Sequence, residues 1–134
     1  MNKKSFLILS VLFLFSCQED FDTHLRKEVL KYTQKHCPMR IEKGNTLDSM
    51  TYEVSTRTLT RWHTLSDVMD LPESKTFFSN HPELVRNELL KELRGDAEKG
   101  TCKDEGISFK YVYRSSANGE VIFTTTFTKS DYER

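Results

Sequence analysis

Residues 107–127, with the sequence ISFKYVYRSSANGEVIFTTTF, carry the clearest structural signal in the chain. Apolar or aromatic side chains occupy every second position of 107–113, and a similar alternation resumes over 121–127 after Asn118-Gly119. A period of two is typical of strands with one buried face, and Asn-Gly is typical of tight hairpin turns. The segment is therefore predicted to form a β-hairpin.

A second hairpin is predicted upstream, over residues 47–65. This stretch is rich in threonine and aromatic residues, and a polar segment at 55–57 divides it into two runs. The pattern of the second run is ambiguous, because Arg61 and His63 would share one face of a strand while Trp62 lies on the other.

Two helices complete the pattern. The first is predicted over residues 21–36 and should end before Cys37-Pro38, because proline disfavours a helical residue before it. A short helical turn is expected near 72–78. A firmer helix should begin at Pro82 and end at Gly95 or Gly100. The first helix presents one apolar stripe: Phe21, Leu25, Val29, Tyr32 and His36.

The order helix, hairpin, helix, hairpin predicts one α+β domain over residues 22–134. We expect an αββαββ fold in which two helices cover an antiparallel four-stranded sheet. This layout resembles small exported bacterial domains of unknown function, and the resemblance implies a loosely cystatin-like shape without implying an activity. The motifs behind it are Cys37-Pro38, Leu47-Asp48-Ser49, Cys102 and Phe109-x-Tyr111-x-Tyr113 with the glycine turn that follows.

The N-terminus has the features of a secretory signal. Asn2-Lys3-Lys4 precedes an uncharged run at 6–15, which is shorter than the about 20 residues that a membrane-spanning helix needs. The run ends in Leu14-Phe15-Ser16-Cys17, which resembles the lipobox of bacterial lipoproteins, although Phe15 is bulkier than usual there.

The lipobox resemblance implies that residues 1–16 are removed as a signal peptide. It also implies that Cys17 receives a diacylglyceryl group and, in many species, an amide-linked acyl chain such as palmitate. Two or three acyl chains hold a protein stably on a bilayer, whereas one is marginal. Residues 17–21 would then be a lipidated N-terminus and short tether, and the membrane would be the first partner of the chain.

Acidic residues follow the anchor over 18–22. This patch resembles the export signal of Bacteroidetes lipoproteins, which directs them to the outer face of the outer membrane. Carboxylates also favour a helix N-terminus, so capping is a compatible second interpretation. We expect a lipid-anchored protein of the cell envelope, at the outer membrane and surface-exposed if the signal acts; which membrane and which face the sequence leaves open.

Two cysteines remain once Cys17 is assigned to lipid, namely Cys37 and Cys102. An even number in an oxidising compartment predicts a disulfide, which in the chain-entropy model would contribute about 4 kcal/mol. Two free thiols or a redox site are the alternatives, and the absence of a Cys-x-x-Cys pair argues against the redox site.

Catalytic and metal-binding motifs are missing from the sequence. The four histidines lack the spacing that places two metal ligands on one helical face, and no nucleophile elbow or phosphate-binding loop is present. We therefore expect no enzyme activity, no metal and no cofactor. Twenty basic and twenty acidic residues leave no net charge to attract nucleic acid.

Two groups of residues are candidates for a binding surface. Tyr111 and Tyr113 would be exposed only if their sheet face were open, and burial in the core is the favoured alternative. Trp62, with Arg61 and His63, is the second candidate. The leading hypothesis is a non-enzymatic module that binds another envelope protein; the alternative is a surface lipoprotein that binds a small ligand or glycan.

Overall fold

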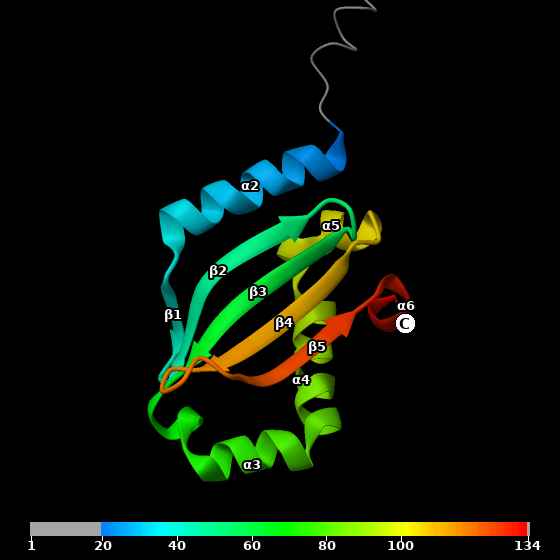
Figure 1. Cartoon of the computed structure of the whole chain (residues 1–134). Coiled ribbons are helices and arrows are strands. Elements are labelled where there is room, and N and C mark those ends of the chain that lie inside the picture. Colours follow the sequence, from blue (N-terminus) through cyan, green and yellow to red (C-terminus); the bar gives the residue numbers. More distant parts are fainter. Residues whose placement is uncertain (1–19, 134) are drawn as a thin grey trace, which may run out of the picture.

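A mixed five-stranded sheet, in the order β1-β2-β3-β4-β5, forms the centre of the fold (Figure 1). The computed structural model describes residues 20–133. The predicted signal peptide and the anchor Cys17 lie outside these residues. The strands are β1 (Met39–Glu42), β2 (Asn45–Glu53), β3 (Thr58–Leu65), β4 (Ser108–Ser115) and β5 (Val121–Phe127). The helices are α2 (Phe21–His36), α3 (Pro72–Asn80), α4 (Pro82–Gly95), α5 (Gly100–Asp104) and α6 (Lys129–Tyr132), with 3-10 turns η1 (Asp67–Asp70) and η2 (Ala97–Lys99).

Both predicted hairpins are confirmed, but the antiparallel four-stranded sheet is wrong. Strands β2 and β3 pair antiparallel, as do β4 and β5, whereas β3 and β4 run parallel with Thr58 opposite Ser108. Strand β1 adds a fifth strand beside β2. The α+β class therefore holds, but the cystatin-like arrangement does not.

The parallel pair follows from the connection between the hairpins. After β3 the chain passes through α3, α4 and α5, which carry it back to the end of the sheet where β3 began (Figure 1). There the amide of Ser108 donates a hydrogen bond of 2.8 Å to the carbonyl of Arg57. Parallel neighbours require such a long crossover, which is commonly helical.

Helix α2 begins and ends where the sequence predicted. Asp20 caps it by accepting a hydrogen bond of 2.7 Å from the amide of Thr23, and the helix stops at His36, before Cys37-Pro38. The predicted capping role of the acidic segment is thus confirmed at Asp20.

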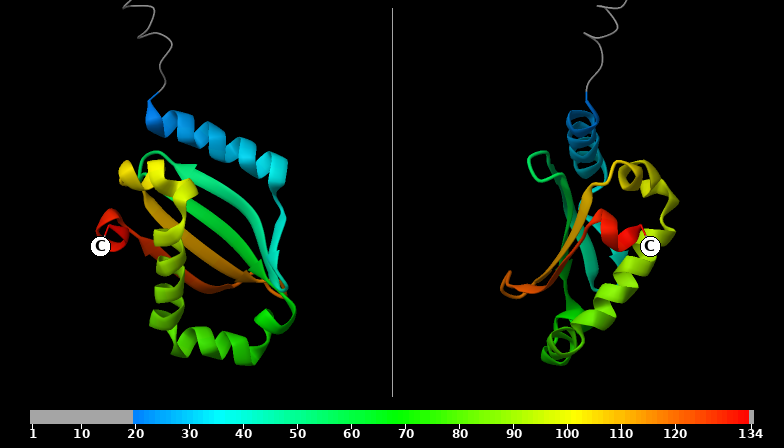
Figure 2. Two further views of the ribbon diagram at one scale, coloured as in Figure 1. Left: turned by 180° about the vertical axis from the view of Figure 1, so that it is seen from behind. Right: turned by 90° about the vertical axis from the view of Figure 1, so that its right-hand side faces the viewer.

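Helix α2 lies along the edge of the sheet beside β2, α4 and α5 lie on one face, and α3 packs beside the other edge strand, β5 (Figure 2). The second helix runs from Pro82 to Gly95 as predicted, and the expected turn near 72–78 is the longer helix α3. Among residues 20–133, no helix has both the length and the apolar content needed to span a membrane.

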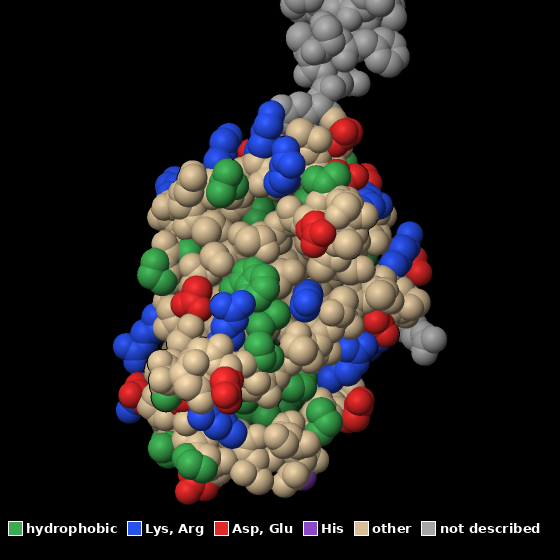
Figure 3. Space-filling view, in the orientation of Figure 1, with side chains coloured by type: hydrophobic (Ala, Val, Ile, Leu, Met, Phe, Trp, Pro, Cys, Tyr) green, Lys and Arg blue, Asp and Glu red, His purple; other side chains and the backbone are tan. Residues whose placement is uncertain are grey.

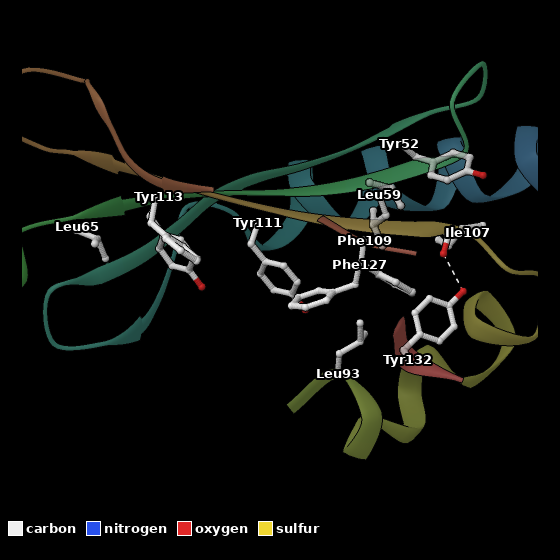
Figure 4. Close-up of a cluster of buried hydrophobic side chains, with 12 residues drawn as sticks. Tyr52, Leu59, Leu65, Leu93, Ile107, Phe109, Tyr111, Tyr113, Phe127 and Tyr132 are labelled. Atoms are coloured by element: carbon white, nitrogen blue, oxygen red, sulfur yellow. Dashed lines mark hydrogen bonds between the residues drawn. The ribbon is translucent and has the colours of Figure 1, made fainter. Parts of the chain in front are cut away.

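The core fills the space between the covered face and α4. Side chains at alternate positions of β3, β4 and β5 project toward Leu93, which is 1% exposed (Figure 4). Tyr132 of α6 closes one end and donates a hydrogen bond of 2.8 Å to the carbonyl of Ile107. The favoured interpretation of the aromatic residues in β4, burial in the core, is therefore confirmed.

Candidate functional site

A polar cavity of about 230 Å³ lies between the covered face of the sheet and α4. It opens to solvent beside exposed residues of β1 and α4. Its inner wall comes from strands β2, β3 and β4. The polar residues that line it include Asn45 of β2, Arg61 and His63 of β3, Tyr111 and Tyr113 of β4, and Glu92 of α4.

A chain of hydrogen bonds fixes His63, which is only 2% exposed. Its Nδ1 lies 2.8 Å from Oδ1 of Asn45, and its Nε2 lies 3.3 Å from Nε of Arg61. Burial, followed by the positive charge of Arg61, lowers the pKa of His63 to about 4. The imidazole is therefore neutral at physiological pH, donating from Nδ1 to Asn45 and accepting at Nε2 from Arg61.

The two tyrosines of β4 lie against this pair. The rings of Tyr113 and His63 stack with centroids 4.6 Å apart, and the guanidinium carbon of Arg61 lies 5.9 Å from the centre of the Tyr111 ring. Burial raises the pKa of both phenols, so each hydroxyl keeps its proton. Within residues 20–133, neither hydroxyl has a hydrogen-bond partner.

The outer wall of the cavity is acidic. Glu42 and Glu92 are exposed and line its opening. Asp96 is paired with Lys99, and this ion pair lowers the pKa of the carboxyl. The cavity therefore places hydrogen-bond donors and one guanidinium inside and carboxylates at its rim, where Lys99 is paired with Asp96. No group of three or more potential metal-ligating side chains gathers anywhere in the described part of the chain.

Trp62 lies on the opposite, uncovered face of the sheet. Its Nε1 donates a hydrogen bond of 2.9 Å to Oγ1 of Thr51, and the guanidinium carbon of Arg114 lies 4.6 Å from the centre of its ring. A shallow pocket beside it is lined mainly by threonine side chains and by Lys110. Figure 3 views this face and shows hydrophobic side chains along its middle with Lys and Arg side chains beside them.

The five predicted binding residues therefore form two groups and not one. Arg61, His63, Tyr111 and Tyr113 meet at the cavity, while Trp62 is separated from them by the sheet. Alternation along β3 accounts for the separation. The sequence analysis missed Asn45 and Glu92, because only tertiary packing brings them to this cavity and neither belongs to a recognisable motif.

The predicted disulfide is wrong in this structure, where Cys37 and Cys102 are both free thiols. Cys37 follows the C-terminal end of α2, and Cys102 lies in α5 near the opposite end of that helix (Figure 1). Arg57 contacts both Asp22 at the start of α2 and Glu105 just after α5. A helix of 16 residues is about 24 Å long, which is far beyond the reach of a disulfide.

Three solved structures share this fold. A Pseudomonas aeruginosa protein described as secreted aligns with a TM-score of 0.66 and 14% identity, over 86% of this chain and 99% of its own. The type 2 secretion system pilotin EpsS of Vibrio vulnificus aligns with a TM-score of 0.61 and 11% identity, over 84% and 96%. The type II secretion system pilotin AspS of Vibrio cholerae aligns with a TM-score of 0.58 and 14% identity, over 82% of this chain and 90% of its own.

At such low identities the likeness establishes a common fold. No curated protein sequence is significantly similar to this chain. A family model does match residues 20–123, which include most of the described fold and every residue of the cavity. The chain belongs to the family described as Domain of unknown function (DUF8479).

Proposed function

We propose that this chain is an exported, non-enzymatic accessory protein that lipid on Cys17 holds at the cell envelope, and that it binds another envelope protein. Two of the solved structures with this fold are pilotins of secretion systems, and the third is described as secreted. These likenesses support an exported accessory role. An anchor also raises the effective concentration of a small domain for its neighbours.

The uncovered face of the sheet is the proposed contact surface, and Trp62 is its centre. The ring is held by Thr51 on one side and by the Arg114 guanidinium, so it is ordered before any partner arrives. Tryptophan and arginine are the residues that most often dominate binding at interfaces. This ordered Trp-Arg pair on a face that no described helix covers is the observation that carries the proposal.

Photocrosslinking in the native host tests the proposal. A benzoylphenylalanine probe replaces exposed Thr126 on the uncovered face, and a control probe replaces Leu84 of α4, which is 51% exposed. We expect one discrete adduct with an envelope protein from the Thr126 probe and none from the Leu84 probe.

Two variants make the result specific. Arg114→Glu should abolish the adduct without disturbing the core, because Arg114 is exposed. Val68→Ala, at a residue of η1 that is 58% exposed, should leave the adduct unchanged. An adduct only from Leu84, or none from either probe, would refute the proposed surface.

A second candidate function is favoured by one observation. The cavity beneath the sheet is lined by the hydroxyls of Tyr111 and Tyr113, which have no protein partner within residues 20–133 and open into it, and this supports binding of a small ligand.

A further inference from the structure

We propose that the cavity binds a free α-amino acid with an aliphatic side chain, with the carboxylate inward and the ammonium group at the rim. This inference names the ligand class of the second candidate function and rests on it. It does not depend on the protein partner proposed for the other face.

The inner wall of the cavity presents hydrogen-bond donors, so it suits a ligand group that accepts hydrogen bonds. Tyr111 and Tyr113 are 6% and 8% exposed, and neither hydroxyl has a partner within residues 20–133. Arg61 uses Nε for His63, which leaves its terminal NH₂ groups for a ligand. Asn45 accepts from His63 through Oδ1, so its amide NH₂ remains a donor as well. These donors are not sealed in the core, because within residues 20–133 only Asp70 Oδ1 is a buried side-chain polar atom without a hydrogen-bond partner; they open into the cavity, where a ligand can reach them.

His63 contributes by position and not by charge. Both of its ring nitrogens are engaged, one with Asn45 and one with Arg61. Its ring also stacks on Tyr113. The imidazole therefore holds Arg61 and Tyr113 in place, while the guanidinium supplies the positive charge. A carboxylate matches this wall because it accepts several charge-assisted hydrogen bonds at once.

The rim selects against a simple anion. Glu42 and Glu92 line the opening, and both are exposed. Lys99 also lines the cavity, but its charge is paired with Asp96, so Glu42 and Glu92 repel a second carboxylate placed there and attract an ammonium group. Leu89 and Leu93 supply the apolar part of the wall, which suits an aliphatic side chain. A cavity of about 230 Å³ has room for a ligand of this size.

Calorimetric titration of the lipidated protein in detergent tests the assignment with three matched probes. L-leucine carries both charges, 4-methylpentanoate lacks the ammonium group, and 3-methylbutylamine lacks the carboxylate. We expect leucine to bind at least about tenfold more tightly than either half-ligand. Each half-ligand lacks one charged group and therefore loses the charge-assisted hydrogen bonds that this group would make.

Variants identify the cavity as the site. Tyr111→Phe should weaken leucine binding about tenfold while keeping the ring in the core. Glu92→Gln should reduce the preference for leucine over 4-methylpentanoate. Tyr32→Phe is the control, because Tyr32 is a surface phenol on α2, 37% exposed, and its loss should change nothing.

The outcomes separate the inference from the function beneath it. If leucine and a half-ligand bind equally tightly, and Tyr111→Phe weakens the binding of both, the amino-acid assignment is overturned and the small-ligand function is kept. Leucine binding that Tyr111→Phe leaves intact would overturn the site. Failure of all three probes to bind would overturn the amino-acid assignment.

Discussion

The hydroxyl of Thr33 on α2 binds both backbone groups of Met50 on β2. It accepts a hydrogen bond of 2.9 Å from the amide and donates one of 2.9 Å to the carbonyl. Strand β1 pairs with β2 only from Asn45 to Leu47, so the rest of that edge has no neighbouring strand. Thr33 therefore takes the place of a missing strand at this point, and α2 protects an edge that would otherwise be open to pairing.

Replacing Thr33 should consequently weaken the fold. Thr33→Val keeps the shape of the side chain but removes both hydrogen bonds, and we expect the free energy of unfolding to fall by about 1–3 kcal/mol. Thr33→Ser retains the hydroxyl and should lose much less. Urea denaturation followed by circular dichroism measures both variants, and equal losses would show that the hydroxyl is unimportant.

Two glycines in turns offer a matched comparison. Gly44 and Gly119 have φ angles of +81° and +73°, so alanine at either position should be destabilising by about 1 kcal/mol from backbone strain. At Gly44 an added Cβ would also lie 2.7 Å from the carbonyl oxygen of Ser66, whereas at Gly119 nothing lies within 4 Å. Thermal unfolding should therefore show a clearly larger loss for Gly44→Ala, and a similar loss in both variants would contradict this packing.

Asp70 should make stability depend on acid pH. Its carboxylate accepts hydrogen bonds from the side chain of Ser116 and the amide of Ala117, at 3.0 and 3.1 Å. A hydrogen bond from Ser115, joined by those from Ser116 and Ala117, lowers the pKa of Asp70 to about 2. A pKa lower in the folded than in the unfolded state stabilises the fold above about pH 4, and this contribution disappears as the pH falls toward 2.

Asp70→Asn should remove that part of the pH dependence. Its stability deficit relative to the unmodified chain should be largest above pH 4 and should shrink toward pH 2, in urea titrations across this range. Glu73→Gln changes an exposed carboxylate on α3 and serves as the control. A deficit that stays constant with pH would exclude the proposed titration of Asp70.

The cysteines give a direct chemical test of the structure. In the Cys17→Ser variant we expect two titratable thiols after denaturation without reductant, because Cys37 and Cys102 are too far apart to pair. Burial raises the pKa of both thiols, so their reaction in the folded protein should be slow. Recovery of no thiols would restore the disulfide that the sequence suggested.

The anchor is tested in cells. Cys17→Ser should block processing of the signal peptide and release the protein from the membrane fraction, because the acyl chains provide the proposed attachment. Incorporation of labelled palmitate and fractionation of cells measure the two effects. Normal processing with retention in the membrane would mean that another feature holds the protein.

Local chemistry in the sequence was sufficient to predict strands β2 to β5 and the two longest helices of this fold, but it did not predict β1, α5 or α6. The alternation in 107–127 predicted one hairpin, and the proline at 38 predicted the end of the first helix, because both signals act between neighbouring residues. The same alternation predicted that Tyr111 and Tyr113 belong to the buried face.

Tertiary structure alone decided how these elements combine. Hydrophobic alternation is the same for parallel and antiparallel neighbours, so the pairing of β3 with β4 depended on the path of the helical crossover. That pairing places Arg61 and His63 beside Tyr111 and Tyr113 and makes the cavity. The separation of Cys37 from Cys102 has a similar origin. The count of cysteines carries no information about distance in space, and the two ends of α2 lie at opposite ends of the sheet edge.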